Sequence, residues 1–376
     1  MSAPDEAGTL LQTPLAGLHA ELGGKMVGFA GYALPVQYPA GVLKEHLHCR
    51  ASAALFDVSH MGQIVLEGAE AAEALESLVP VDVLGLKPGR QRYAMFTNAD
   101  GGILDDLMVA NLGERLFLVV NAACKAADFA HLQAHLGQAA QWLPDRALIA
   151  LQGPKAGAAL ARHAPGVTAL RFMDVAEMTI AGADCIVSRS GYTGEDGFEI
   201  SVPAGAAEAL ARALIGEPEV EPAGLGARDS LRLEAGLCLY GSDIDTTTSP
   251  VEANLAWAIQ KVRRRGGARE GGFPGAERIL RELETGPARL RVGLKPEGRA
   301  PVRAHAPLFD REDAAEAVGA VTSGGFAPSL GAPVAMGYLP AAMAENDTRI
   351  FAELRGRRVP MRVCPMPFHP TSYKRN

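Results

Sequence analysis

Two adjacent acids, Asp105 and Asp106, stand where a carboxylate could do chemistry. They follow a Gly-Gly turn and begin an apolar run that is typical of a β-strand. Neighbouring side chains on a strand point to opposite faces, so Asp106 shares its face with Met108 and Ala110, and only one acid can face a given pocket. A carboxylate in such a pocket can accept or relay a proton. The alternative is that both acids lie in water at the start of the strand, and the spacing alone favours it.

A glycine-rich segment at residues 191–200 is the second candidate. Its sequence is Gly191-Tyr192-Thr193-Gly194-Glu195-Asp196-Gly197-Phe198-Glu199-Ile200. Three glycines at intervals of three indicate tight backbone turns, although neither the dinucleotide-binding nor the phosphate-binding glycine pattern is present. One interpretation is a loop that brings Tyr192 and a carboxylate to a planar ligand. The other is a hairpin turn with solvated acids, and the pattern does not decide between them.

Arg228, Asp229 and Arg232 form the third candidate, on a run with helical spacing that ends at Gly236. An arginine here can hold a carboxylate through two parallel hydrogen bonds. Surface ion pairing is the commoner use of such charges. The spacing therefore predicts a helix and leaves the role of its arginines open.

Three other clusters offer weaker signals. Ser59 and His60 would diverge on a strand, so they are not expected to form a catalytic pair. The run His46-Leu47-His48-Cys49 lacks metal-binding spacing and a partner cluster. The five cysteines are odd in number and include no Cys-x-x-Cys pair, so neither a disulfide framework nor a zinc site is expected. The run Arg263-Arg264-Arg265 is expected to be a solvated connector, with contact to an acidic partner or an anionic ligand tail as the less favoured alternative.

The composition is that of a globular chain. It has 376 residues, of which 48% are hydrophobic and 21% charged, and a formal net charge of −7. A negative chain has no overall attraction for nucleic acid or an anionic membrane, so neither is expected as a partner. No stretch reaches the roughly 20 apolar residues of a membrane helix, and residues 1–11 lack the features of a signal or transit peptide. Cytoplasm is the expected compartment, although a mature organellar chain would look similar.

The elements that must position these residues alternate between strand and helix over the first two thirds of the chain, which is typical of an α+β fold. Strands are expected at residues 63–66, 107–112 and 116–120, and helices at 69–79, 123–136, 204–215 and just after Gly153-Pro154. Beyond residue 262 a helix at 276–284 is followed by short β runs at 290–294, 318–322, 334–338 and 350–354. These runs predict a small all-β barrel or sandwich, so we expect two units, residues 1–275 and 285–376.

Nine segments, in the same order, resemble the aminomethyltransferase (T protein) family of the glycine cleavage system. The resemblance covers nearly the whole chain, and this many collinear blocks make it specific. The blocks are Thr13-Pro14-Leu15, Lys25 to Tyr32, Phe56 to Gly62, Gly101 to Leu107, Leu151 to Pro154, Gly191 to Ile200, Leu225 to Asp229, Tyr240 to Asp245 and Val321 to Gly324.

The resemblance implies an enzyme with a three-lobed folate-binding fold, in which two intertwined α+β subdomains precede a C-terminal all-β barrel domain. It implies tetrahydrofolate as co-substrate in a central channel. The implied protein partner is a lipoyl carrier (the H protein) that bears an aminomethyl group on sulfur. The products would be 5,10-methylenetetrahydrofolate, ammonia and the dihydrolipoyl carrier, and no metal or tightly bound redox cofactor is implied.

The resemblance also assigns site residues. The family's key aspartate matches Asp106, in agreement with the one-face argument, and leaves Asp105 as a structural or solvent-facing neighbour. The resemblance matches the pterin-binding carboxylate to Glu199 rather than Glu195. An ionised carboxylate suits the adjacent donors of the pterin edge. The ligand-binding arginine, the C-terminal tyrosine and the residues lining the folate channel match Arg228, Tyr373, Met61, Tyr93, Asn121 and Tyr192.

Two positions depart from the family pattern. Ala110 stands where some relatives have an aromatic residue, which puts packing against the ligand in question, and Gly28 replaces a common aspartate. Two other functions stay open at this point: a stand-alone folate-dependent demethylase of a small methylated compound, and a non-catalytic folate-binding accessory protein. The chain lacks the Lys-Gly-Cys-Tyr-x-Gly-Gln-Glu signature of the accessory relatives.

Overall fold

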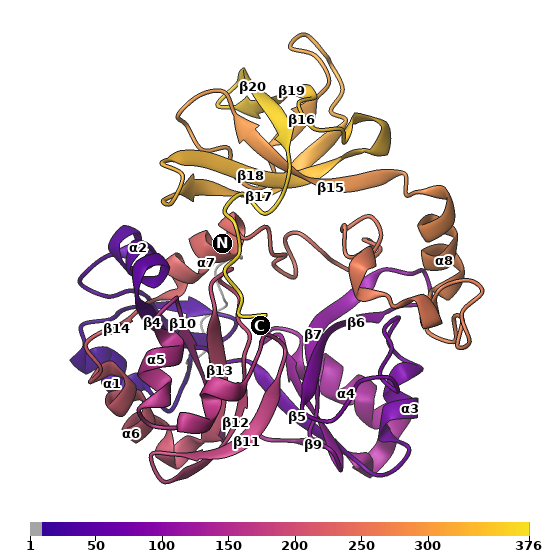
Figure 1. Cartoon of the computed structure of the whole chain (residues 1–376). Coiled ribbons are helices and arrows are strands. Elements are labelled where there is room, and N and C mark those ends of the chain that lie inside the picture. Colours follow the sequence, from indigo (N-terminus) through magenta and orange to yellow (C-terminus); the bar gives the residue numbers. More distant parts are fainter. Residues whose placement is uncertain (1–9, 376) are drawn as a thin grey trace.

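The computed structural model describes residues 10–375, which form three lobes around the C-terminal segment (Figure 1). Two lobes are built on largely antiparallel sheets flanked by helices, and the third is a closed six-stranded barrel. The predicted α+β fold with a C-terminal all-β barrel is therefore confirmed. The C-terminal segment leaves the barrel and ends between the other two lobes.

The first lobe holds a five-stranded sheet in the order β6-β7-β8-β5-β9. Its elements are β5 (Gly62–Glu67), α3 (Ala71–Glu76), β6 (Arg90–Thr97), β7 (Ile103–Asn111), β8 (Arg115–Val120), α4 (Lys125–Leu136) and β9 (Ala140–Trp142). Leu75 of α3 and Leu132 of α4 pack on the sheet face that buries Leu107 and Leu118. The β7–β8 hairpin turns around Gly113, as the sequence predicted.

The second lobe holds a six-stranded sheet in the order β11-β12-β13-β10-β4-β14. Its strands are β4 (Ala53–Asp57), β10 (Arg146–Gln152), β11 (Val175–Ile180), β12 (Ala183–Ser188), β13 (Gly197–Pro203) and β14 (Val220–Pro222). Alternate residues of β4 bury on opposite faces. Ala53 and Leu55 pack under α1 (Ala16–Glu21), α5 (Ala156–Ala161) and α6 (Ala204–Ile215). Ala54 and Phe56 pack under α2 (Val42–Ala51) and α7 (Leu225–Glu234). A small sheet of β1 (Leu11–Gln12), β3 (Tyr32–Gln37) and β2 (Lys25–Phe29) adjoins them.

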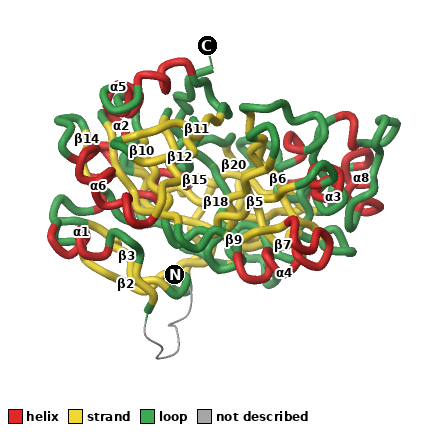
Figure 2. The backbone as a smooth tube through the Cα atoms, turned by 90° about the horizontal axis from the view of Figure 1, so that it is seen from below, coloured by secondary structure: helices red, strands yellow, loops and turns green. Residues whose placement is uncertain are grey.

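The two sheets meet along an apolar contact. Val65, Ala110 and Phe117 of the first lobe pack against Val175 and Ile186 of the second. Figure 2 shows both sheets near the centre, with α5 and α6 towards one side and α3 and α4 towards the other. Ala110 is 2% exposed within this contact. It therefore packs between the two lobes.

The barrel has the strand order β15-β18-β17-β16-β19-β20. Its strands are β15 (Arg289–Pro296), β16 (Pro307–Phe309), β17 (Gly319–Ala327), β18 (Ala332–Pro340), β19 (Arg349–Leu354) and β20 (Arg357–Cys364). Helix α8 (Ala276–Thr285) leads into it, and Ile279 of this helix packs with Val251 and Phe273. The sequence predicted four of the strands and missed β16 and β20. Within residues 10–375, none of the helices is long and apolar enough to cross a membrane.

Candidate active site

The turn before β7 is fixed by the chain segment that follows α7. Gly101 has a φ of +79°, and a Cβ on Gly102 would lie 1.8 Å from the Thr246 carbonyl oxygen, so a side chain has no room there. The Asn98 side-chain oxygen closes the turn by accepting hydrogen bonds from the backbone N–H groups of Asp100 (3.0 Å) and Gly102 (2.9 Å). The Gly-Gly sequence thus determines where β7 begins and which way its two acids point.

Asp106 is hydrogen-bonded to two of the predicted site residues. The Tyr93 hydroxyl donates to its Oδ2 atom (3.0 Å), and the Asn121 side-chain amide donates to its Oδ1 atom (2.7 Å). Burial raises the pKa of Asp106 to about 7, and the negative charge of Asp105 acts in the same direction. A carboxyl group with this pKa exchanges a proton readily near neutral pH.

Asp105 points away from that side, as strand alternation predicts, but it is not in water. It is fully buried with Leu107 and Val109. The Asn121 backbone N–H (3.0 Å) and side-chain amide (2.9 Å) donate to its carboxyl oxygens. The interpretation that both acids are solvated is therefore wrong. Of the two alternatives for Asp105, a structural or a solvent-facing neighbour, the solvent-facing one is also wrong. The sequence did not show α4 covering this face.

Arg228, Tyr192 and Glu199 form a second group. The Arg228 guanidinium lies over the Tyr192 ring, 4.8 Å from its centroid. Its Nη1 atom is buried and has no hydrogen-bond partner among residues 10–375. Burial raises the pKa of Glu199, and the Arg228 charge opposes that shift. The Ser190 hydroxyl, at 3.4 Å, is a weak donor to Glu199. The Arg228 Nη1 atom can thus still donate a hydrogen bond to a ligand, and the Glu199 carboxylate can still accept hydrogen bonds from one.

Tyr192 connects the two groups. Its hydroxyl donates to the Cys238 carbonyl oxygen. Burial raises the pKa of Tyr192, while the charges of Arg232 and Arg228 oppose this shift and the Asp106 charge adds to it. One phenol is therefore within electrostatic range of both Asp106 and Arg228. Residues 191–196 connect the antiparallel strands β12 and β13, and Glu195 is 4% exposed, so the expectation of solvated acids is wrong for Glu195.

Met61 and Tyr373 occupy different places. Met61 packs with Val119 against the cluster that contains Ala227, next to Arg228. Tyr373 stacks on Phe172, with ring centroids 4.0 Å apart and planes at 13°. Its segment crosses the 191–197 loop, where Ser372 N–H donates to the Gly194 carbonyl (2.9 Å). No hydrogen bond or ring contact within the described residues joins Tyr373 to Asp106.

Two residues near this site were not predicted. Trp257 stacks on Tyr93 at a centroid distance of 5.5 Å and is 63% exposed, so one aromatic face is open beside Asp106. His60, dismissed as half of a dyad, has a buried Nδ1 atom without a partner in residues 10–375. Burial and the nearby Arg228 charge lower the pKa of His60 to about 3, so its ring is neutral. No sequence motif surrounds Trp257, so its position beside Tyr93 can be recognised only in the folded structure.

The arginine run at 263–265 is only partly a solvated connector. Arg263 is 4% exposed and pairs with Glu76 (3.2 Å), so that part of the prediction is wrong. Arg264 donates to the carbonyl oxygens of Ile259 (2.8 Å) and Ala256 (2.7 Å). Arg265 is exposed.

In residues 10–375, no three His, Cys, Asp or Glu side chains are placed to hold a metal ion.

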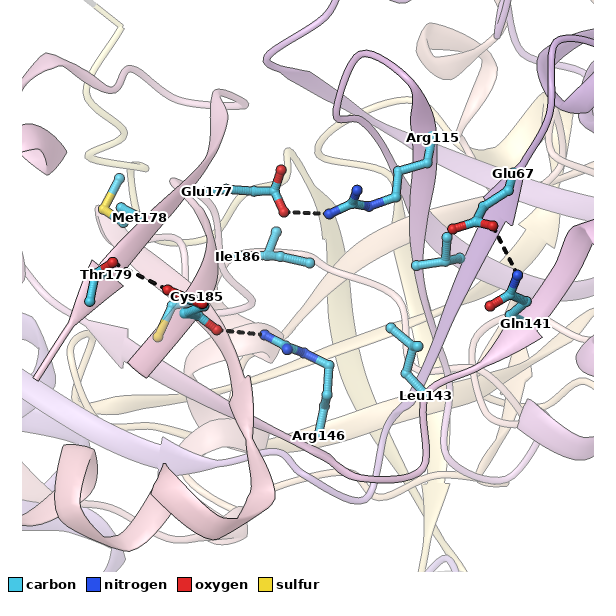
Figure 3. Close-up of a pocket in the computed structure, with 12 residues that line it drawn as sticks. Glu67, Arg115, Gln141, Leu143, Arg146, Glu177, Met178, Thr179, Cys185 and Ile186 are labelled. Atoms are coloured by element: carbon cyan, nitrogen blue, oxygen red, sulfur yellow. Dashed lines mark hydrogen bonds and ion pairs between the residues drawn. The ribbon is translucent and has the colours of Figure 1, made fainter. Parts of the chain in front are cut away.

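A cavity of about 600 Å³ lies elsewhere, at the junction of the two sheets (Figure 3). It is lined by Arg115, Arg146 and Glu177 among others, and Arg115 stands at the opposite end of β8 from Val120. Arg115 pairs with Glu177, and Arg146 donates to Ser201 and to the Asp184 carbonyl. Arg115 and Arg146 thus already have partners within this cavity.

Comparison with known proteins decides the family. The family model described as "GCVT N-terminal domain" matches residues 15–263, and the "Glycine cleavage T-protein C-terminal barrel domain" matches residues 289–369. The chain belongs to the glycine cleavage T-protein family. A solved aminomethyltransferase T from Bartonella henselae is 48% identical, with a TM-score of 0.91 over 98% of this chain and 100% of that one.

Mitochondrial aminomethyltransferases are also similar over nearly their whole length. The Dictyostelium discoideum protein is 44% identical over 97% of this chain and 94% of its own, and the Homo sapiens protein is 46% identical over 97% and 91%. The predicted family and enzyme class are confirmed: the T-protein chain is an aminomethyltransferase of the glycine cleavage system, a folate-dependent transferase.

Proposed function

We propose that the chain transfers the methylene carbon of an aminomethyl-dihydrolipoyl H protein to tetrahydrofolate. In this reaction the C–S bond and the C–NH₂ bond break, and bonds from carbon to folate N5 and N10 form. The two N–H protons pass to ammonia and to the dihydrolipoyl thiol. The observation that carries the proposal is Asp106, held by Tyr93 and Asn121 with a raised pKa, beside an open aromatic face.

Glu199 and Arg228 are the proposed pterin site. A carboxylate can accept from the adjacent amino and ring N–H donors of a pterin edge, and Glu199 has only one weak side-chain donor of its own. Arg228 offers its unpartnered Nη1 atom to an acceptor on the same ligand. Trp257, stacked on Tyr93, offers a further aromatic ring a stacking surface. Met61, Asn121 and Tyr192 line the proposed channel between these groups, and Tyr373 closes it from the C-terminal segment.

Asp106 is the proposed catalytic acid–base group. Holding folate and the lipoyl arm in attack geometry supplies most of the rate, because effective molarity contributes roughly 7–11 kcal/mol. Proton acceptance by Asp106 adds about 10²–10⁴-fold. In its ionised form it also stabilises the iminium-like cation that forms as ammonia leaves. The carbon keeps one oxidation level throughout, so the transfer as written needs neither a redox cofactor nor a metal.

The relatives from Dictyostelium discoideum and Homo sapiens carry the word mitochondrial in their names. We propose the matrix as the compartment of a eukaryotic mature chain, and the cytoplasm otherwise. The proposed division into residues 1–275 and 285–376 places Asp106, Glu199 and Arg228 in the first unit and Tyr373 in the second.

The deciding assay supplies the purified chain with aminomethylated lipoyl H protein and tetrahydrofolate. Equal amounts of ammonia and 5,10-methylenetetrahydrofolate are expected, and neither product forms when the lipoyl group is absent. Activity with dimethylated or sulfonium compounds but not with the carrier would favour the demethylase function. Folate binding without either activity would favour the accessory function.

A further inference from the structure

A third carboxyl group lies behind the reaction centre and has no part in the steps proposed above. Asp128 stands in the first turn of α4 and is 4% exposed. Its Oδ2 atom finds no donor among residues 10–375. The neighbour it faces is Asp105, which is fully buried and is tied to Asp106 through the Asn121 amide.

The contact between the Asp128 and Asp105 carboxyl groups determines which of the two carries a proton. Asp128 lies one helical turn before Leu132 on α4, and Leu132 packs with Leu107 and Val109, which share the Asp105 face of β7. The two buried carboxyl groups therefore face each other and can share one hydrogen bond. Two ionised carboxylates only accept, so one of the pair carries a proton. Asp105 already accepts from the backbone and the side chain of Asn121. Burial raises the pKa of Asp105 and these donors oppose that shift, whereas Asp128 Oδ2 has no donor among residues 10–375, which leaves the proton on Asp128.

Among residues 10–375, the charges of Arg291 and Arg232 reach Tyr93, Tyr192 and Cys238 at the edge of the cluster. The neutral titratable groups that face it are phenols and thiols. They come from β6, the start of α4, the 191–197 loop and the segment after α7, and are Tyr93, Cys124, Tyr192, Cys238 and Tyr240. Within residues 10–375 no lysine or arginine forms an ion pair with the three aspartates. Three buried negative charges without a cation are too costly to coexist.

We propose that Asp128 is a positioning residue that stays protonated, donates its O–H to Asp105 and fixes Asp105 as the anion next to Asp106. Burial and the Asp105 charge raise the pKa of Asp128 to about 10, in agreement with this arrangement. A permanent charge on Asp105 makes Asp106 bind its proton more tightly. Asp128 then keeps its proton, while Asp106 exchanges its own. The inference rests on the assignment of Asp106 as the reacting acid.

Infrared spectroscopy of the folate-free enzyme tests the protonation without reference to activity. Near neutral pH, the difference spectrum between wild type and Asp128→Asn should contain one protonated-carboxyl C=O band, which wild type loses on titration past about pH 10. The exposed Asp100→Asn variant, in the turn before β7, should retain the band. A difference spectrum without a protonated-carboxyl band overturns the proposal.

The pH dependence of kcat/KM supplies the second measurement. The Asp128→Asn side chain is neutral and keeps an N–H donor, so the acid limb of its pH profile of kcat/KM should coincide with that of wild type. Asp128→Ala lacks this donor and should lose activity. A limb that moves about one unit lower in Asp128→Asn would mean that Asp128 is ionised, and would overturn the proposal. If Asp106 is not the reacting acid, Asp106→Asn keeps the limb while the infrared band still reports Asp128. Failure of the two assignments is therefore distinguishable.

Discussion

Arg232 and Asp243 form a buried ion pair that helps to hold the barrel against the other two lobes. The Arg232 Nη1 atom lies 2.8 Å from Asp243 Oδ2, and both residues are less than 5% exposed. Ser323 of β17 donates to the same carboxyl oxygen (2.8 Å), and the Arg232 Nη2 atom donates to the Ser323 hydroxyl (3.0 Å). Tyr338 of β18 donates to the Asp243 carbonyl (2.6 Å). Helix α7, which presents Arg228, is thereby held in place by the barrel.

Replacing Asp243 should therefore destabilise the protein. Asp243→Asn leaves the buried Arg232 charge without its counter-ion and is expected to lower the free energy of unfolding by about 3 kcal/mol. Asp229, the other partner of Arg232, has a side chain that is 63% exposed. Asp229→Asn is the matched control and should cost less than about 1 kcal/mol. Denaturant titrations of both variants measure this, and equal losses would contradict a structural role for the buried pair.

Asp106→Asn should separate binding from turnover. The amide occupies the same space and can still accept from Tyr93, so folate affinity is expected to stay within about threefold of wild type, while kcat falls at least about 10²-fold. Calorimetry measures the first and the ammonia assay the second. Asp100→Asn, in the turn that precedes the same strand, should leave both unchanged. Full turnover in Asp106→Asn would remove Asp106 from the chemistry.

The raised pKa of Asp106 also predicts a pH-dependent stability. The folded protein keeps a proton on Asp106 up to about pH 7, whereas the unfolded chain releases it near pH 3.8. Between these values the folded state binds more protons, so this group lowers stability as pH rises, with no effect below the unfolded pKa and its full effect above the folded one. The stability of Asp106→Asn relative to wild type should therefore increase between about pH 4 and about pH 8. A pH-independent difference would mean that Asp106 is ionised throughout.

Local patterns in the sequence sufficed for elements whose stability is local. The helix expected at 204–215 is α6 with the same bounds, because its small and apolar residues repeat at helical spacing. β16 and β20 were missed because they exist only as barrel partners: β16 has three residues, and β20 carries four arginines or prolines in eight positions. Strand alternation correctly separated Asp105 from Asp106, yet it could not say that α4 covers the Asp105 face.

For the site residues too, the sequence predicted the local element but not the contacts between distant segments. The spacing of Arg228 and Arg232 predicted a helix but not the role of either side chain. Only the fold shows that Arg232 forms an ion pair with Asp243, while the Arg228 Nη1 atom has no partner in the described residues. Arg263 looks like a surface charge until Glu76, far away in the sequence, appears beside it. No sequence motif surrounds Trp257, and its stacking on Tyr93 requires β6 and the segment after α7 to meet.

Arg228→Gln should weaken folate binding far more than it affects the fold. The guanidinium Nη1 atom has no protein partner in the described residues, so its hydrogen bond is available only to a ligand. Losing a charged hydrogen bond of about 2 kcal/mol corresponds to roughly thirtyfold weaker binding. Calorimetric titration with tetrahydrofolate checks this, with Arg299→Gln as an exposed control. Unchanged affinity would place the pterin elsewhere.

The loop at residues 261–267 is the remaining basic surface next to the open aromatic face. Lys261, Arg264 and Arg265 line a hollow of about 470 Å³. Arg264 donates to the carbonyl of Ala256, the neighbour of Trp257, so these charges lie near the tryptophan that stacks on Tyr93. A carrier that must insert its lipoyl arm here would meet them first. An acidic carrier surface would then be attracted at close range, and salt would weaken the attraction.

Reversing two of these charges tests that docking surface. The double variant Lys261→Glu/Arg265→Glu should raise the KM for the aminomethylated carrier about tenfold at low ionic strength and flatten its salt dependence, while kcat at saturating carrier and folate affinity stay near wild type. Lys155→Glu/Arg299→Glu makes the same change in net charge at exposed positions on the second lobe and the barrel. Because this control alters the overall field but not the entrance, its carrier KM should change little. If both double variants raise the KM equally, net charge rather than the 261–267 loop governs the encounter, and the carrier docks on another face.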